Sequence, residues 1–152
     1  MTTSNKIEKL LWSIALPGFG QFLNKQYVKG ITLIILEFVI NTQAHLNLLI
    51  IYSFQGDIDG AIQVTDFHWL MFYPCLYMFG MWDAYKDAGT TAPFAYLPFV
   101  LGAFFGTVGI MFSTKLKLFG VLFGPVWLPM LFAFLGIFTG IVLFLIIRRV
   151  VR

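Results

Sequence analysis

The side chain that most needs a chemical explanation in this sequence is Glu37, a carboxylate in the middle of a long apolar run. Asn41 and His45 follow at intervals of four residues, so the three share one face of a helix. If the run crosses a membrane, an ionisable group within it is costly, and this face should contact other helices rather than lipid. The sequence therefore predicts an intramembrane polar stripe of Glu37, Asn41 and His45.

Two functions fit such a stripe. In the first, Glu37 is the titrating group of a proton or ion relay, with His45 near its outer mouth. In the second, the stripe is a hydrogen-bond cluster between helices that fixes their register. We prefer the second, because the sequence offers one intramembrane acid and no second strongly polar crossing to complete a pathway. The polar residues leave a further alternative, a shorter helix that breaks near residues 41–47.

His45 and His68 flank a loop that carries three acids, Asp57, Asp59 and Asp66. Imidazole and carboxylate groups can bind a divalent cation, but this spacing matches no recognised ligand pattern, so we expect a solvated loop without a metal. The sequence also lacks a Ser-His-Asp order, a nucleophile elbow, a phosphate-binding glycine loop and a zinc-protease helix signature. We therefore expect neither enzyme activity nor a cofactor, and an enzyme acting on lipid is the least favoured class.

The composition indicates a membrane protein. Of the 152 residues, 59% are hydrophobic and 11% are charged, whereas about a quarter of the residues in a soluble domain are charged. The net charge of +3 comes without a basic stripe that could follow a phosphate backbone, so we expect no nucleic-acid partner. Cys75 is the single cysteine, which excludes an intrachain disulfide, and we expect it to be a buried small hydrophobe.

Stretches long enough to cross a hydrocarbon layer are the elements that must position these side chains. A crossing helix needs about 20 residues, and we expect four crossings, near residues 31–54, 67–85, 94–113 and 129–147. Two further segments, 10–23 and 118–128, are broken by proline and glycine, and we interpret them as re-entrant or interfacial. The predicted fold is all-α, a polytopic helical membrane bundle that forms a single integral membrane domain over residues 1–152.

Both broken segments leave an alternative open. Segment 10–23 could cross by thinning the bilayer, and residues 118–147 could form one long kinked helix. The positive charges help to decide the first case, because cytoplasmic flanks of membrane helices carry an excess of Lys and Arg. If segment 10–23 does not cross, the cytoplasmic residues are Lys6, Lys9, Lys25, Lys29, Lys86, Arg148, Arg149 and Arg152, against Lys115 and Lys117 outside.

A crossing by segment 10–23 would move Lys6 and Lys9 to the outer side and weaken this division. We therefore prefer the arrangement in which the segment does not cross. It predicts cytoplasmic N- and C-termini and an external acidic loop at 55–66.

Glycines four residues apart predict close approach of helices, because they leave a groove that another helix can enter. Such pairs occur at Gly102 and Gly106, at Gly120 and Gly124, and at Gly136 and Gly140. We expect all six to serve helix packing, either within the chain or between copies of it.

A second group of residues should join segment 10–23 to the crossing at 67–85. After Pro17, Gly18 and Gly20 permit a bend or close packing, and Gln21 and Asn24 can satisfy backbone groups that the break exposes at membrane depth.

Asp83, beside Trp82 at the cytoplasmic interface, is the expected partner of this segment. It could accept hydrogen bonds from Gln21 or Asn24, or form an ion pair with Lys25 or Lys29. The hypothesis is that the first segment docks on the inner end of the second crossing through Asp83.

These motifs resemble a known family. The run Leu16-Pro17-Gly18-Phe19-Gly20-Gln21, followed by Asn24, Tyr27, Lys29 and Gly30, resembles the opening of small bacterial membrane proteins of the TM-two domain family. Trp82-Asp83-Ala84-Tyr85 resembles the end of that family's second helix, although the stretch 41–66 intervenes here. The resemblance covers residues 10–88 and implies a compact hairpin-like module in the bacterial cytoplasmic membrane, with no substrate attached.

The leading functional hypothesis is a non-enzymatic membrane protein that acts through helix–helix contacts, as a scaffold, assembly or accessory subunit. Its partners would be the lipid bilayer and either a second copy of the chain or another membrane protein. The alternative is a small transporter or channel that uses Glu37, Asn41 and His45.

Overall fold

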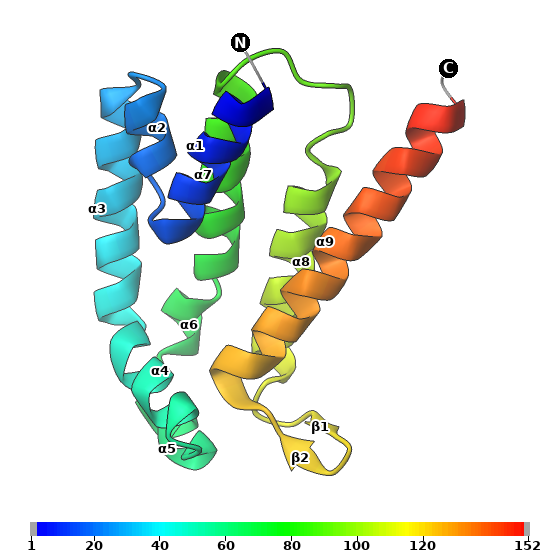
Figure 1. The fold of residues 1–152 in the computed structure, drawn as a ribbon. Helices are drawn as coiled ribbons and strands as arrows, with labels where there is room; N and C mark the ends of the chain where they lie inside the picture. The colour runs from blue at the N-terminus through cyan, green and yellow to red at the C-terminus, as the bar shows by residue number, and fades with distance from the viewer. Residues whose placement is uncertain (1–2, 151–152) are drawn as a thin grey trace.

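The computed structural model describes residues 3–150, and it confirms the prediction of an all-α chain (Figure 1). A short two-stranded hairpin is the β-structure in this part of the chain. In chain order the elements are α1 (Thr3–Ala15), α2 (Phe19–Leu23), α3 (Tyr27–Gln43), α4 (Leu46–Phe54), α5 (Ile58–Val64), α6 (Phe67–Leu70), α7 (Tyr73–Asp87), α8 (Leu97–Phe112), β1 (Lys117–Leu118), β2 (Val121–Leu122) and α9 (Gly124–Val150).

The helices run between two ends of the molecule (Figure 1). One end, called here the terminal end, holds the start of α1, the end of α2, the start of α3 and the ends of α7 and α9. The opposite end holds α4, α5 and the β1–β2 hairpin. Helices α1 and α2 form a helical hairpin that starts at the terminal end and returns to it, so the predicted break within segment 10–23 is a reversal of the chain.

The first expected crossing, 31–54, is not one straight helix. It consists of α3 and α4, which are bent by 62° relative to each other. The break lies at His45, whose φ of 54° is left-handed and ends the regular helix. A single helix over 31–54 was therefore wrong, and the alternative of a break near residues 41–47 is what the structure has.

Prolines explain where two other helices begin. Pro74 lies in the first turn of α7 and Pro98 in the first turn of α8, where a missing N–H costs no helical hydrogen bond. Residues 67–85 are consequently divided into the short α6 and the longer α7. The stretch 94–113 is shortened to α8.

The expected boundary between segment 118–128 and the last crossing, near residue 129, is not where the structure has it, because the separate part ends at residue 122. Residues 117–122 form the β-hairpin, and α9 then runs without interruption from Gly124 through Pro129. Pro129 removes one backbone hydrogen bond, but it is fully packed against α8, where a Cβ added to Gly109 would lie 2.7 Å from the Cα of Pro129. Tertiary packing therefore keeps the helix continuous where the local signal predicts a break.

The surface of the molecule is unusually apolar. Large exposed hydrophobic side chains occur on every long helix, including Phe38 on α3, Phe104 on α8 and Phe138 on α9, which are 71%, 62% and 65% exposed. The buried residues, in contrast, include polar ones such as Gln21 and Asp83. In residues 3–150, α9 alone is long and apolar enough to cross a membrane by itself, and 11% of its apolar window is buried. Helices α3 and α4 pass the same test as one broken span.

Candidate functional site

The α1–α2 hairpin is held between α3 and α7 by close backbone approach. Gly18, with a φ of 110°, faces α3, and an added Cβ would lie 2.6 Å from the carbonyl oxygen of Gly30. Gly20 faces α7, and an added Cβ would lie 2.6 Å from the Cβ of Ala84. These distances leave no room for a side chain at either position. The two glycines therefore let α2 approach both neighbours at backbone contact.

A polar cluster crosses this contact. The fully buried Gln21 donates from Nε2 to the carbonyl oxygen of Gly80, at 2.9 Å, and to Oδ2 of Asp83, at 3.1 Å. Asn24 donates from Nδ2 to the carbonyl oxygen of Ala84, at 2.8 Å. We call Gln21, Asn24, Lys29, Asp83 and Asp87 the Asp83 cluster. It joins α2 and the start of α3 to the last turns of α7.

Lys29 bridges two carboxylates of α7. Its Nζ lies 2.9 Å from Oδ1 of Asp83 and 2.8 Å from Oδ2 of Asp87. The side chain of Lys29 is 49% exposed, whereas that of Asp83 is 9% exposed. The buried carboxylate therefore has its charge compensated by a partner that reaches water.

These ion pairs shift two pKa values outside the apolar segments 31–54 and 67–85. Hydrogen bonds to Asp87 and then Asp83 raise the pKa of Lys29. Burial opposes ionisation of Asp87, but hydrogen bonds from Lys29 and Gln26 outweigh it and lower the pKa of Asp87. Both groups are consequently held in their charged forms over a wider pH range.

The contacts of Asp83 include two that the sequence suggested, with Gln21 and with Lys29. Asn24 instead donates to a backbone carbonyl, and the described residues show no ion pair between Asp83 and Lys25. Trp82 packs on Phe99 of α8, with ring centroids 5.6 Å apart.

Sequence reasoning missed Asp87, although its position four residues after Asp83 places both acids on one helical face. It also missed the carbonyl of Gly80 as an acceptor, which no side-chain pattern could have indicated.

Glu37 belongs to a separate group in the interior. It is 9% exposed, and one of its carboxylate oxygens is buried without a hydrogen-bond partner in the described residues. The side chain of Tyr73 from α7 lies close enough to interact with the carboxylate. Tyr77, one turn further along α7, donates its hydroxyl to the carbonyl of Ile14 at the tip of the α1–α2 hairpin. Glu37 therefore faces α7, as a residue of an interhelical cluster should.

The predicted stripe does not continue beyond Glu37 as a single face. Asn41 is half-buried and donates to Asn47 of α4 at 3.4 Å. His45 lies after the end of α3, is exposed, and caps the start of α4 with left-handed backbone. The spacing argument failed because it assumed an unbroken helix through residue 45.

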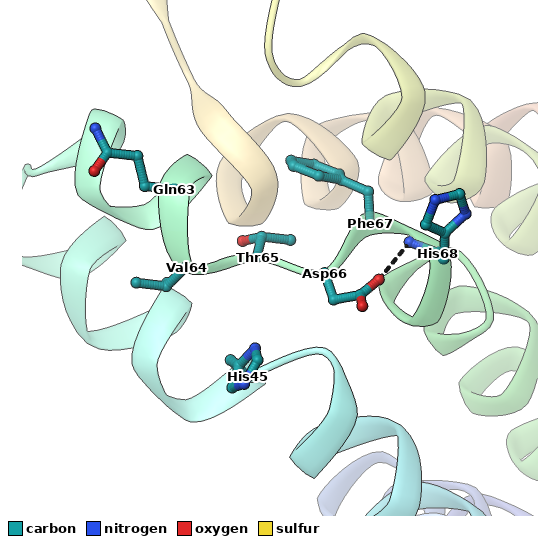
Figure 2. Close-up of a pocket in the computed structure, with 7 residues that line it drawn as sticks. All are labelled: His45, Gln63, Val64, Thr65, Asp66, Phe67 and His68. Carbon is teal, nitrogen blue, oxygen red and sulfur yellow. Dashed lines mark hydrogen bonds between the residues drawn. The ribbon is translucent and has the colours of Figure 1, made fainter.

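His45 instead lines a shallow surface pocket at the opposite end of the molecule (Figure 2). Its other lining residues run from Gln63 to His68. Asp66 turns its carboxylate toward its own helix and accepts from the backbone N–H of His68 at 2.9 Å (Figure 2). Within residues 3–150 no three His, Cys, Asp or Glu side chains are grouped to hold a metal ion.

Four of the six paired glycines lie where helices α8 and α9 meet. An added Cβ would lie 2.9 Å from Ile137 at Gly102 and 2.5 Å from the Cα of Pro98 at Gly140, while Gly136 touches the carbonyl of Leu101. Gly106 lies at an ordinary 3.5 Å from Ala133 of α9 and closer, at 3.1 Å, to Pro74 of α7. Close packing of α8 on α9 through these glycines is therefore internal to the chain.

The third glycine pair does not form one groove for another helix, contrary to the prediction, because only Gly124 contacts a neighbouring helix. Gly120 lies in the turn of the β-hairpin with open space around it, and Gly124 begins α9 against Ile58 of α5. Both have positive φ, of 82° and 72°, which favours glycine. At Gly124 the close approach of Ile58, 2.7 Å from an added Cβ, is a second reason.

Cys75 is exposed rather than buried, which corrects another expectation. It lies in an apolar groove between α3 and α7, beside Leu36, Val39 and Phe72. The prediction failed because an apolar neighbourhood in the sequence was taken to mean the interior, whereas this chain exposes its apolar faces.

No family model, curated protein or solved structure matches this chain. The geometry of the Asp83 cluster must therefore be interpreted by its own chemistry. Its amide donors, its lysine and its two carboxylates are engaged with one another or with backbone carbonyls, which is an arrangement that holds helices together.

Proposed function

We propose that this chain is a multi-pass integral membrane protein in which α3, α7, α8 and α9 cross the bilayer and the α1–α2 hairpin is re-entrant. The observation that carries this proposal is the distribution of polar and apolar side chains, which is the reverse of that in a soluble protein. Apolar side chains cover the outer faces of α3, α8 and α9, while Gln21, Asp83 and Glu37 are buried. In water that surface would be strongly unfavourable, whereas in lipid it is the expected one.

The positions of the charges support an orientation. Lysines of α1 and α3, together with Lys86 and the two arginines in the last turn of α9, lie at the terminal end. Lys6 of α1 donates to the carbonyl of Thr90 in the loop after α7, so these basic segments are in contact. The acidic residues Asp57, Asp59 and Asp66 lie at the opposite end. With the positive-inside rule, this supports a cytoplasmic terminal end and an external acidic segment at 55–66. Most of that segment is helix α5 rather than the expected loop.

Aromatic residues support the same boundaries. Trp82, Tyr85 and Tyr96 gather near the terminal end, with Trp82 and Tyr96 6.1 Å apart between ring centroids. Trp127 lies near the opposite end, where its indole N–H donates to the carbonyl of Ser53 at 3.2 Å. Such amphipathic rings favour the two levels of the lipid headgroups.

For its activity we propose a scaffold, assembly or accessory subunit that acts by contact with a second copy or another membrane protein. The polar groups of the Asp83 cluster are used to fix helices, and Glu37 is separated from His45 by the bend between α3 and α4. Both features favour a structural use of the polar residues. The resemblance to TM-two domain proteins accords with this proposal and with a bacterial cytoplasmic membrane.

A proton or ion relay is the second candidate, because one buried oxygen of Glu37 has no hydrogen-bond partner among residues 3–150. Two measurements separate the candidates. Purification in mild detergent after crosslinking should recover a defined partner or a homo-oligomer, and vesicles containing the protein should stay tight to protons and ions. Flux that depends on pH and disappears in Glu37→Gln would overturn the scaffold proposal in favour of the relay.

A further inference from the structure

The hairpin between α8 and α9 ends in an apolar tip. Lys117 pairs with Leu122 and Leu118 with Val121, which leaves Phe119 and Gly120 as the two residues of the turn. Phe119 is 103% exposed and Val121 is 59% exposed. The sequence from residue 118 to residue 122 is Leu-Phe-Gly-Val-Leu, without a polar side chain. A tip of this kind presents an aromatic ring at its outermost point.

The backbone at the tip is unfavourable for the residue that occupies it. Both turn residues have positive φ, 53° at Phe119 and 82° at Gly120, as a type I′ hairpin turn requires. Asn or Gly normally occupies the first of these positions, because a bulky side chain is strained in left-handed backbone. Phenylalanine contributes nothing to this turn and makes no core contact from a fully exposed position. Strain of this kind is a reason to look for a function of the side chain outside the fold.

The residues around the hairpin favour lipid as the surroundings of the Phe119 ring. The exposed Lys115 and Lys117 precede the tip, and Trp127, the interfacial tryptophan, follows it in the first turns of α9. The neighbouring faces of α8 and α9 are apolar and exposed at Met111, Phe112 and Met130. An apolar tip that continues a lipid-facing surface and has lysines at its base fits the boundary between headgroups and acyl chains. The lysine ammonium groups would then lie level with lipid phosphates.

We propose that the β1–β2 hairpin is a membrane-inserting tip, with Phe119 and Val121 in the outer-leaflet interface and Lys115 and Lys117 on lipid phosphates. This inference rests on the proposed membrane placement of α8 and α9. It adds a specific lipid contact that the crossings alone do not require, since the hairpin could equally extend into water or against another protein.

Nitroxide accessibility tests the proposal in vesicles of phosphatidylcholine with phosphatidylglycerol. In a Cys75→Ser background, single cysteines replace Phe119 at the tip, Phe138 on the exposed face of α9 and Asp59 in the first turn of α5. Each is spin-labelled, and its collisions with oxygen, which enters lipid, and with a water-soluble nickel chelate are measured. We expect the label at 119 to favour oxygen over nickel several-fold, as at 138, while the label at 59 favours nickel.

The other outcomes overturn the proposal in distinguishable ways. A label at 119 that behaves as at 59 would place the tip in water. A label at 119 that neither reagent reaches would place it against protein, in a second copy or a partner. If the label at 138 also favours nickel, the membrane placement of α9 fails, and the proposed function fails with it.

Discussion

Asp83 is the residue on which the contacts of its cluster converge, since it accepts from a buried amide and from a lysine that reaches water. Replacing it with alanine should lower the free energy of unfolding by about 1–3 kcal/mol, because the buried Gln21 and Lys29 both lose a partner. Lys29→Ala should cost less than about 1 kcal/mol, since half of this side chain is exposed. Unfolding in detergent micelles measures both.

The double variant Lys29→Ala/Asp83→Ala tests whether the ion pair between these two residues stabilises the fold. The combined loss should be smaller than the sum of the single losses, because each substitution removes the same ion pair. Lys25→Asn is the matched control, as this neighbouring lysine has positive φ, which Asn tolerates. Its effect should add to that of Asp83→Ala. Purely additive losses for Lys29 and Asp83 would show that their contact does not stabilise the fold.

The Lys29–Asp87 pair predicts how stability depends on pH. The lowered pKa of Asp87 adds stability that is present above the ordinary value of 3.8 and is lost as the pH falls below it. The raised pKa of Lys29 adds stability that is present below 10.5 and is lost as the pH rises above it. We therefore expect melting temperatures in detergent to form a plateau between these limits.

Asp87→Asn should flatten the acid limb of this profile, because it removes the carboxylate whose pKa is lowered, while Asp83 remains paired with Lys29. Glu8→Gln, an exposed acid on α1 at the same end of the molecule, serves as the control and should leave the limb in place. An acid limb that is equally steep in Asp87→Asn would exclude this ion pair as its source.

At the scale of elements, the docking of α2 depends on space as much as on hydrogen bonds. Gly20→Ala should destabilise the protein by about 1–3 kcal/mol, because the new Cβ would lie 2.6 Å from both the Cβ of Ala84 and the backbone carbonyl of Lys9. Neither atom can rotate away. The α1–α2 hairpin would have to separate from α7, which proteolysis in detergent would detect as cleavage within residues 3–25.

Gly80→Ala is the matched control for this prediction. Gly80 lies on α7 at the same contact, but an added Cβ would meet Pro17 at an ordinary distance of 3.4 Å. It should be tolerated, and the better helix propensity of alanine should offset any small cost. Equal effects of the two substitutions would show that α2 does not approach α7 as closely as the structure has it.

At the scale of the whole molecule, the sequence predicted contacts best where the chemistry of a side chain alone identifies its partner. Asp83 needs a donor or a cation, so Gln21 and Lys29 could be anticipated. The break at His45 and the continuity through Pro129 stayed alternatives in the sequence, because the choice in each case depends on how a helix packs against another. The exposure of Cys75 was missed because apolar residues in this chain cover its outside.

The central claim is that α1–α2 is re-entrant, so that residue 8 and the α7–α8 loop share one side of the membrane while the α4–α5 loop lies on the other. In a Cys75→Ser background, single cysteines at Glu8, Gln55 and Ala92, all exposed, can be labelled in bacterial spheroplasts with a membrane-impermeant maleimide. We expect labelling at residue 55 in intact spheroplasts, and at residues 8 and 92 only after permeabilisation. Labelling of residue 8 together with residue 55 would show that the first segment crosses the membrane, and would contradict this account.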